Sequence, residues 1–327
     1  MLQQRTMNEA NTPEIVIVAG PTASGKSALA LAIAEEFAGT IINADSQQVY
    51  RDLAVLSARP SEVEMARVPH RLYGVIDAAE NWSAGRWLAL AHREIDAASA
   101  AGRLPILTGG TGLYLEALLN GLAELPPIPA SARDEAKALH AALGGVAFRE
   151  RLATLDPVSA AKLGANDTQR LTRAYEVALA TGKSLSQWQT EQASAPDLRA
   201  AVVVLLPERE GLYQACDTRV TAMVALGAEE EARTLLARGL ATNLPAMKAV
   251  GLRELGAVLD GSVTRDEAVA AMQQATRNYA KRQYTWFRNR LQESGILRRI
   301  TINKQFSVSL LPDIFSFIRH SLLTSRG

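Results

Sequence analysis

The segment GPTASGKS, residues 20–27, restricts the possible folds of this chain more than any other stretch. It follows a β-branched run at residues 15–18 and precedes a helix-forming stretch, ALALAIAEEF. Its spacing is that of a phosphate-binding loop, in which backbone N–H groups, a helix N-terminus and a lysine surround an anion. A glycine turn without a ligand is the alternative, but strand, loop and helix together favour phosphate binding. The predicted phosphate-binding residues are Gly20, Pro21, Thr22, Ala23, Ser24, Gly25, Lys26 and Ser27.

Strand and helix signals alternate through the first third of the chain. A short strand in GTIINADSQQVY ends at Asp45, and a strand at residues 104–107 leads into the glycine-rich turn of LTGGTGLYLEALLNG. This alternation predicts an α/β fold with a mostly parallel sheet flanked by helices. Ligands of such sheets bind beyond the carboxyl ends of the strands, where the phosphate loop, Asp45 and residues 109–111 are expected to meet.

The alternation stops at AELPPIPASARD, where three prolines mark a boundary. The chain is then helical in pattern until a strand signal returns at LRAAVVVLLP. We expect a disordered tail at 1–14, a phosphate-loop core at 15–123 and 198–327, and a smaller all-helical insertion at 124–197. A length of 327 residues is consistent with more than one core. Residues after Leu297 carry no usable motif.

Composition excludes several classes of protein. The net charge is +1 and Cys216 is the only cysteine, which excludes an internal disulfide framework and suits a reducing cytoplasm. The first fourteen residues lack the apolar core of a signal peptide, and no apolar run is as long as a membrane span. The histidines show no ligand spacing, so no structural metal is expected. These features predict a cytoplasmic protein without membrane association.

Two residues near the expected ligand site remain open to two interpretations. Asp45 alone would most often be a turn or helix-cap aspartate. Beside the phosphate loop, however, its carboxylate could accept a proton from a substrate or bind a cation. For Thr111, ligand contact and a plain glycine-rich turn are about equally favoured by the spacing.

The strongest local concentration of positive charge is ATRNYAKRQYTWFRNRLQESGILRR, with seven Lys or Arg and one Glu. Read as a helix, it places Arg277, Lys281 and Arg288 along one flank. Its apolar stripe is Ala280, Tyr284, Phe287 and Leu291. A solvated basic face and a nucleic-acid contact have equal weight here, because tyrosine and tryptophan between the charges could stack on bases.

Several segments together resemble one family, the tRNA dimethylallyltransferases, also called tRNA isopentenyltransferases. They are GPTASGKS, NADSQQVY, PHRLYGVID, LTGGTGLYLEALLNGL, NDTQRLTRAYEVALATGKSLS, MKAVGLREL and AKRQYTWFRN, in the family's order over roughly residues 15–289. The chain departs from the family at Arg71, where a second histidine is usual, and in VGLRE, where relatives more often have Ile-Gly-Tyr-Arg. We therefore assign no role to His70.

The resemblance implies transfer of a dimethylallyl group from its diphosphate to N6 of the adenosine immediately 3′ of the tRNA anticodon. It implies that Asp45 is the general base and that Lys26, Thr22 and Arg219 act on the departing diphosphate. Without the resemblance, Arg219 would be read as a surface arginine. Mg²⁺ is the expected cofactor, held near Ser27 and Asp45. The resemblance also implies binding of the anticodon stem-loop; a monomer is expected, although the sequence does not give the oligomeric state.

The tRNA contacts implied by the resemblance come from six parts of the chain. They are Asp45, Ser46, Gln47, Gln48, Thr111, Arg133, Gln169, Arg170, Leu171, Thr172, Arg173, Arg253, Lys281, Arg282, Gln283 and Arg288.

Three other functions are consistent with parts of the sequence. A small-molecule kinase would use the same loop for ATP and Asp45 to accept a hydroxyl proton, but would not need the helical insertion or the basic helix. A nucleotide-dependent RNA-binding switch is less favoured, because the only Asn-Lys pair is followed by Gln305 and Phe306. An adenylate isopentenyltransferase would share the donor, but the segments expected to contact tRNA argue against it.

Overall fold

The computed structural model describes residues 13–191, 198–291 and 297–323. The chain divides into two compact units, one formed by residues 1–117 and 197–327 and the other by residues 118–196. The predicted tail at 1–14 reaches into the first strand, which begins at Glu14, while residues 1–12 lie outside the described part. No helix in the described ranges is long and apolar enough to cross a membrane.

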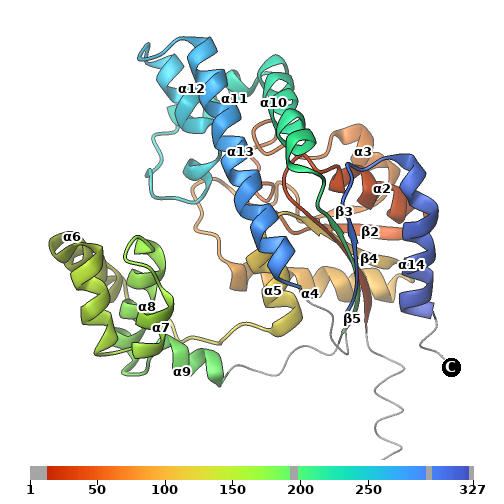
Figure 1. The fold of residues 1–327 in the computed structure, drawn as a ribbon. Coiled ribbons are helices and arrows are strands. Elements are labelled where there is room, and N and C mark those ends of the chain that lie inside the picture. Colours follow the sequence, from red (N-terminus) through yellow and green to blue (C-terminus); the bar gives the residue numbers. More distant parts are fainter. Residues whose placement is uncertain (1–12, 192–197, 292–296, 324–327) are drawn as a thin grey trace, which may run out of the picture. The chain divides into compact units, whose positions relative to one another are not determined.

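The first unit is built on a six-stranded sheet with the order β3-β2-β4-β1-β5-β6 (Figure 1). Every strand pairing that the structure describes is parallel, which confirms the predicted α/β fold with a mostly parallel sheet. The apolar run of β5 fits a central strand that is covered on both faces. The strands are β1 Glu14–Ala19, β2 Gly39–Asn43, β3 His70–Arg71, β4 Leu104–Gly109, β5 Arg199–Leu205 and β6 Leu297–Ile302.

Helices α2 and α14 lie together beside the sheet (Figure 1). Leu29 and Ile33 of α2 share one buried cluster with Ile314 and Ile318 of α14 and with Val16 of β1. Residues 297–323 therefore contribute a strand and a helix to this unit. The helices of this unit are α2 Lys26–Glu36, α3 Glu62–Arg67, α4 Ala84–Ala100, α5 Gly112–Asn120, α10 Arg209–Ala225, α11 Ala228–Ala237, α12 Leu252–Leu259, α13 Arg265–Asn289 and α14 Leu311–Leu323, with the division between units falling inside α5.

Helix α13 carries the basic segment and packs against α10. Its N-terminus is a capping box, in which Thr264 and Glu267 satisfy each other's backbone N–H groups. Ala280, Phe287 and Leu291 of the predicted apolar stripe are buried, and Tyr284 is half-buried. The periodicity therefore identified the buried face of this helix.

The second unit consists of helices α6 Ala130–Ala153, α7 Pro157–Lys162, α8 Thr168–Thr181 and α9 Leu185–Thr190. Phe148 and Leu152 of α6 pack against Leu171 and Tyr175 of α8. Gly144 interrupts α6 with a φ of 72°, which kinks the helix. The apolar cluster gives this unit a core of its own.

Candidate functional site

The segment 20–27 connects β1 to α2, which gives the strand–loop–helix arrangement of a phosphate-binding loop. Gly20 and Gly25 have φ values of 151° and 89°. A Cβ atom at Gly20 would lie 2.6 Å from the carbonyl oxygen of Leu205, so a larger residue does not fit there. Helix α2 begins at Lys26 directly after Gly25, and its first N–H groups face the loop.

Two positively charged side chains, those of Lys26 and Arg219, lie at this loop. Lys26 is buried, and its Nζ donates to the carbonyl oxygen of Pro21 at 3.3 Å. Burial and the neighbouring Arg219 lower the pKa of Lys26 to about 8, and Asp45 opposes this shift. Arg219 comes from α10 and donates to Thr22 Oγ1 at 3.0 Å. In the described ranges neither cation has an ion-pair partner, so the pair forms a site suited to an anion.

Asp45 follows β2 at the carboxyl edge of the sheet and is half-buried. Its Oδ1 accepts the N–H of Gln47 at 2.9 Å, so the carboxylate does support a turn. Asp45 also contributes to the electrostatic environment of Lys26 and Arg219. One carboxylate oxygen therefore serves the turn, and the negative charge of the side chain raises the pKa of both Lys26 and Arg219 against the effect of burial.

Asn43 holds the backbone of Asp45 in place, a role that the sequence analysis missed. This asparagine is fully buried. Its Oδ1 accepts the N–H of Asp45 at 2.9 Å, and its Nδ2 donates to the carbonyl oxygens of Asp45 and Leu72 at 3.0 Å. Trp87 Nε1 donates to the carbonyl oxygen of Asn43 at 2.8 Å. The available signal was an asparagine ending an otherwise apolar strand, where a buried amide needs partners.

The second glycine-rich turn packs against the Asp45 loop. A Cβ atom at Gly109 would lie 2.1 Å from the carbonyl carbon of Ala44, so this glycine is required by close backbone contact. Thr111 Oγ1 accepts the N–H of Ser46 at 2.9 Å. The turn thus positions the residues after β2. Through its hydrogen bond to Ser46, Thr111 is held beside the loop that carries Asp45.

Gln47 and Gln48 follow Asp45 and are both half-buried. Gln48 Nε2 donates to the carbonyl oxygens of Ser57 and Ala58 at 3.0 and 2.9 Å, which ties the loop to itself. Gln47 Oε1 is buried and has no hydrogen-bond partner among the residues that the structure describes. Gln47 therefore offers an unused acceptor beside Asp45.

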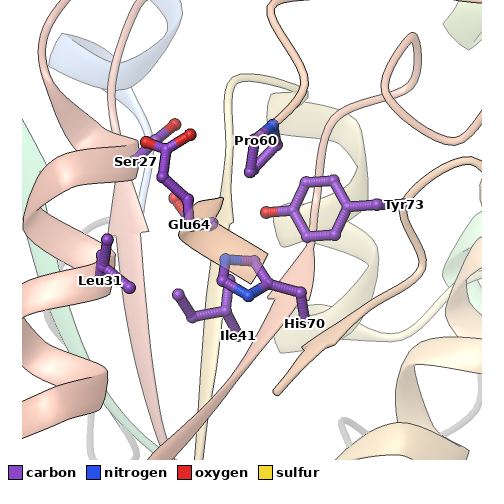
Figure 2. Close-up of a pocket in the computed structure, with 8 residues that line it drawn as sticks. Ser27, Leu31, Ile41, Pro60, Glu64, His70 and Tyr73 are labelled. Carbon is purple, nitrogen blue, oxygen red and sulfur yellow. The ribbon is translucent and has the colours of Figure 1, made fainter. Parts of the chain in front are cut away.

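A cavity of about 10 Å³ lies next to Ser27 (Figure 2). This volume is enough for about one water molecule. Thr108 also lines the cavity, and its buried hydroxyl, like that of Ser24 in the loop, has no partner among the described residues. Figure 2 shows Glu64 and Tyr73 near the same space. Burial raises the pKa of Tyr73, so its hydroxyl stays protonated.

Hydroxyl and carboxylate oxygen atoms, such as those of Ser27 and Asp45, suit Mg²⁺ better than a softer metal. Across residues 13–191, 198–291 and 297–323, no group of three or more His, Cys, Asp or Glu could hold a metal ion by itself. A cation bound near Ser27 and Asp45 would therefore need further oxygen ligands from a bound phosphate compound and from water.

The predicted contacts on α13 divide into exposed and buried residues. Lys281, Arg282 and Arg288 are exposed. Arg277 of the same flank donates to Asp217 Oδ1 of α10 at 2.5 Å. Gln283 is only 6% exposed, and its carboxamide contacts the phosphate loop, so we correct its assignment as a direct tRNA contact. Helical spacing alone did not separate these residues, because flanking positions can face either way.

Arg253, at the start of α12, is also exposed: its side chain is 92% accessible and reaches Glu254 at 3.5 Å.

The predicted contacts in the helical unit also divide. Arg133, Gln169 and Arg170 are exposed. Leu171 is fully buried among Phe148, Leu152 and Tyr175, so we correct its assignment as a tRNA contact as well: its side chain is part of the core.

Thr172 and Arg173, the next two predicted contacts on α8, make their side-chain contacts within that helix. Thr172 Oγ1 donates to the carbonyl oxygen of Thr168 at 2.8 Å. Arg173 pairs with Glu176 at 2.5 Å.

Comparison with known proteins gives consistent matches. The family model described as IPP transferase matches residues 48–290. The chain is 52% identical to the tRNA dimethylallyltransferase of Rhodospirillum rubrum over 312 residues, or 95% of each protein. It is 51% identical to that of Paramagnetospirillum magneticum over 320 residues, or 98% of this chain and 100% of the relative.

Solved structures match as well. The tRNA isopentenylpyrophosphate transferase of Bacillus halodurans has a TM-score of 0.66 and 30% identity, covering 96% of this chain and 100% of that structure. A eukaryotic dimethylallyltransferase acting on tRNA has a TM-score of 0.75 at 24% identity, covering 96% of this chain and 78% of that one, which shows the shared fold.

Proposed function

The chain belongs to the IPP transferase family, and on that premise we propose that it is a tRNA dimethylallyltransferase. It transfers a dimethylallyl group from dimethylallyl diphosphate to N6 of the adenosine immediately 3′ of the tRNA anticodon, and releases diphosphate. The observation that carries this proposal is the meeting of an anion site, formed by Lys26 and Arg219, with the carboxylate of Asp45 at one edge of the sheet.

The diphosphate end of the donor fits the phosphate loop. The backbone N–H groups of residues 25–27, Lys26 and Arg219 would contact its oxygens. Negative charge on these oxygens grows as the C–O bond of the donor breaks, so the two cations stabilise the transition state more than the ground state. Thr22 takes part by holding the Arg219 guanidinium through its hydroxyl.

Mg²⁺ is the cation that fits the oxygen atoms available here. Ser27 would hold it through the hydroxyl group and Asp45 through the carboxylate, directly or through water. When bound, it supplies further neutralisation of the diphosphate charge. The partnerless hydroxyl of Thr108 beside Ser27 supports a polar, hydrated environment at this position.

Asp45 is the proposed general base. The amino group of adenine is a weak nucleophile because its lone pair is delocalised into the ring. As N6 forms the bond to the allylic carbon and the C–O bond breaks, the N6 proton passes to the Asp45 carboxylate. Such a base contributes about 10²–10⁴-fold to rate. The Gln47 N–H donates to this carboxylate, and Asn43 holds the backbone of Asp45 by accepting its N–H.

The acceptor adenosine must leave the stack of the anticodon loop to reach this carboxylate. We propose that Ser46, Gln47, Gln48 and Thr111 contact it or its neighbours. Exposed or half-buried residues elsewhere would bind the tRNA backbone and loop, where phosphate contacts position the RNA and unstacked bases give specificity. These are Arg133, Gln169, Arg170, Thr172, Arg173, Arg253, Lys281, Arg282 and Arg288.

One chain supplies the loop, Asp45 and Arg219 to a single site, which supports a monomeric enzyme. We place it in the cytoplasm with its tRNA substrate.

The proposal is tested by incubating the protein with Mg²⁺ and labelled dimethylallyl diphosphate, with unmodified tRNA or AMP as acceptor. A parallel reaction contains ATP and small alcohols. We expect label in tRNA at the adenosine after the anticodon. Label only in AMP would indicate an adenylate isopentenyltransferase, and consumption of ATP with phosphorylation of the alcohols would indicate a kinase.

A further inference from the structure

The phosphate loop contains a residue with a side chain in the left-handed region of backbone conformation. Ala23 has a φ of 64°, which a residue with a Cβ atom adopts at an energetic cost. The two glycines of the loop with positive φ, Gly20 and Gly25, adopt such values without this cost. The turn at Thr22 and Ala23 therefore needs support from its surroundings.

Two glutamines from distant parts of the chain provide hydrogen bonds at this turn. Gln283 of α13 accepts the N–H of Thr22 through Oε1 at 2.8 Å. Gln305, in the segment after β6, donates through Nε2 to the carbonyl oxygen of Ala23 at 2.6 Å. The Pro21–Thr22 peptide group and the Ala23–Ser24 peptide group are thus each held by a carboxamide.

Gln283 also connects the loop to the second glycine-rich turn. Its Nε2 donates to the carbonyl oxygen of Gly110 at 2.8 Å. A Cβ atom at Gly110 would lie 2.1 Å from this nitrogen, so the glycine leaves the space that the carboxamide occupies. Glutamine has both an acceptor and a donor for these two contacts. Glutamate would lack the donor, and methionine would lack both.

Gln305 belongs to a short segment that covers the loop. Its neighbour Phe306 is packed so closely that a Cβ atom at Gly25 would lie 2.7 Å from the Phe306 Cβ. Phe306 also joins the cluster formed by α2, α14 and the sheet. The segment following β6 is therefore fixed in the core while its glutamine reaches the phosphate loop.

We propose that Gln283 and Gln305 are positioning residues, which hold the turn at Thr22 and Ala23 in the conformation that binds diphosphate. The identity of the anion rests on the proposed function, but the hydrogen bonds do not. Gln283 is on the same helix as the exposed residues Lys281, Arg282 and Arg288. The helix proposed to bind tRNA therefore also holds the loop proposed to bind the donor.

The test measures binding of inorganic diphosphate in the presence of Mg²⁺ by calorimetry on the full chain. Gln283→Met and Gln305→Met keep side-chain length and remove the hydrogen bonds. Each is expected to weaken diphosphate binding about tenfold, because a loop peptide group loses its partner. In the transfer assay, KM for dimethylallyl diphosphate rises while KM for tRNA stays unchanged. Gln274→Met, on the exposed side of the same helix, is the matched control.

A second variant addresses the turn itself. Ala23→Gly removes the cost of the positive φ, so adding it to Gln305→Met should recover part of the lost diphosphate affinity. Two results would overturn the proposal. One is that the two glutamine variants bind diphosphate as tightly as Gln274→Met does. The other is that adding Ala23→Gly to Gln305→Met recovers no affinity. Because diphosphate binding is read without tRNA transfer, failure of the proposed function in the transfer assay would be seen separately. Unfolding midpoints identify any variant that fails to fold.

Discussion

The two units of the molecule each bury a polar cluster, and the clusters differ in how their groups are satisfied. In the helical unit, Asp156 is fully buried and accepts four hydrogen bonds. The N–H and hydroxyl of Ser159 donate at 3.0 and 2.7 Å, and those of Ser186 at 3.1 and 2.7 Å. At the phosphate loop, Lys26 and Arg219 have no ion-pair partner among the described residues, and the Ser24 hydroxyl has no hydrogen bond there.

The pKa values of the two clusters show what this difference means. Burial alone would raise the pKa of Asp156, but the hydrogen bonds from Ser159 and Ser186 outweigh it and lower the pKa. The pKa of Lys26 is also lowered, by burial and by Arg219. A lowered pKa favours the charged form of a carboxylate and disfavours that of a lysine. The first cluster is therefore satisfied within the chain, whereas the second has the charge and the open donors that a bound anion would satisfy.

The largest effect is expected for Asp45→Asn, which tests whether the phosphate-loop cluster performs chemistry. Asparagine keeps an oxygen for the N–H of Gln47, so the turn and the unfolding midpoint should be preserved. The rate of a single turnover at saturating substrates should fall about 10²–10⁴-fold, because the base is lost. A rate close to that of the unaltered enzyme, or loss of folding, would leave Asp45 with the turn role alone.

The second largest effect is expected in the Asp156 cluster of the helical unit, whose hydrogen bonds are all made within the chain. Asp156→Ala removes the acceptor of four buried hydrogen bonds and should lower the free energy of unfolding of the helical unit by about 3 kcal/mol. Hydrogen exchange along α8 measures this locally. Asp134→Ala on α6, whose side chain is 76% exposed, is the control and should change little. Diphosphate affinity should be unaffected by either change.

The same cluster gives a pH dependence with a defined sign. Because the folded-state pKa of Asp156 lies below its ordinary value, its contribution is present at neutral pH and is lost as pH falls through that lowered pKa. Asp156→Ala should therefore remove part of the acid sensitivity of α8 protection. An unchanged acid profile in the variant would show that other carboxylates control it.

The phosphate loop could be predicted from the sequence because its determinants are adjacent in the chain. Glycines, Lys26 and Ser27 stand within eight residues, between a strand and a helix. Arg219 could not be assigned in this way. Its local sequence is that of an ordinary surface arginine, and only the packing of α10 brings it to Thr22, 197 residues away in the chain. The resemblance to a family, and not the local pattern, pointed to it.

Gln283 shows a different limit. It follows Ala280 and precedes Phe287 at the spacings of one helix face, so the periodicity did indicate burial. The family resemblance nevertheless led to its assignment as a tRNA contact. Strand β6 was missed because LRRITI carries two arginines in a six-residue edge strand. Its pairing with β5 depends on the rest of the sheet.

A smaller effect is expected on the pH dependence of diphosphate binding, because Lys26 has no ion-pair partner among the described residues. Because the pKa of Lys26 is lowered to about 8, some of the Lys26 side chains are neutral near that pH in the free enzyme. Diphosphate favours the charged lysine, so binding near pH 8 should take up protons, and affinity should fall as pH rises through this range. Calorimetry in two buffers with different heats of ionisation measures this uptake.

Lys26→Arg is the control, because arginine stays charged in this range. The titration of diphosphate itself is common to both proteins, so the difference between them belongs to Lys26. Equal proton uptake in the two proteins would mean that Lys26 is already fully charged before the anion binds.

The smallest effect extends the comparison to the surface of α13. Arg277 is satisfied within the chain by Asp217, as Asp156 is by its serines. Lys281 and Arg288 are exposed, without an ion-pair partner in the described ranges. If the exposed pair contacts tRNA phosphates, Lys281→Ala and Arg288→Ala should each reduce the salt dependence of tRNA binding, log K against log salt, by about 0.7–0.9. Arg277→Ala should leave this slope unchanged while lowering the stability of the α10 and α13 packing. The titration is read by anisotropy of a labelled anticodon stem-loop, and equal slopes for all three variants would mean that the basic face of α13 is only solvated.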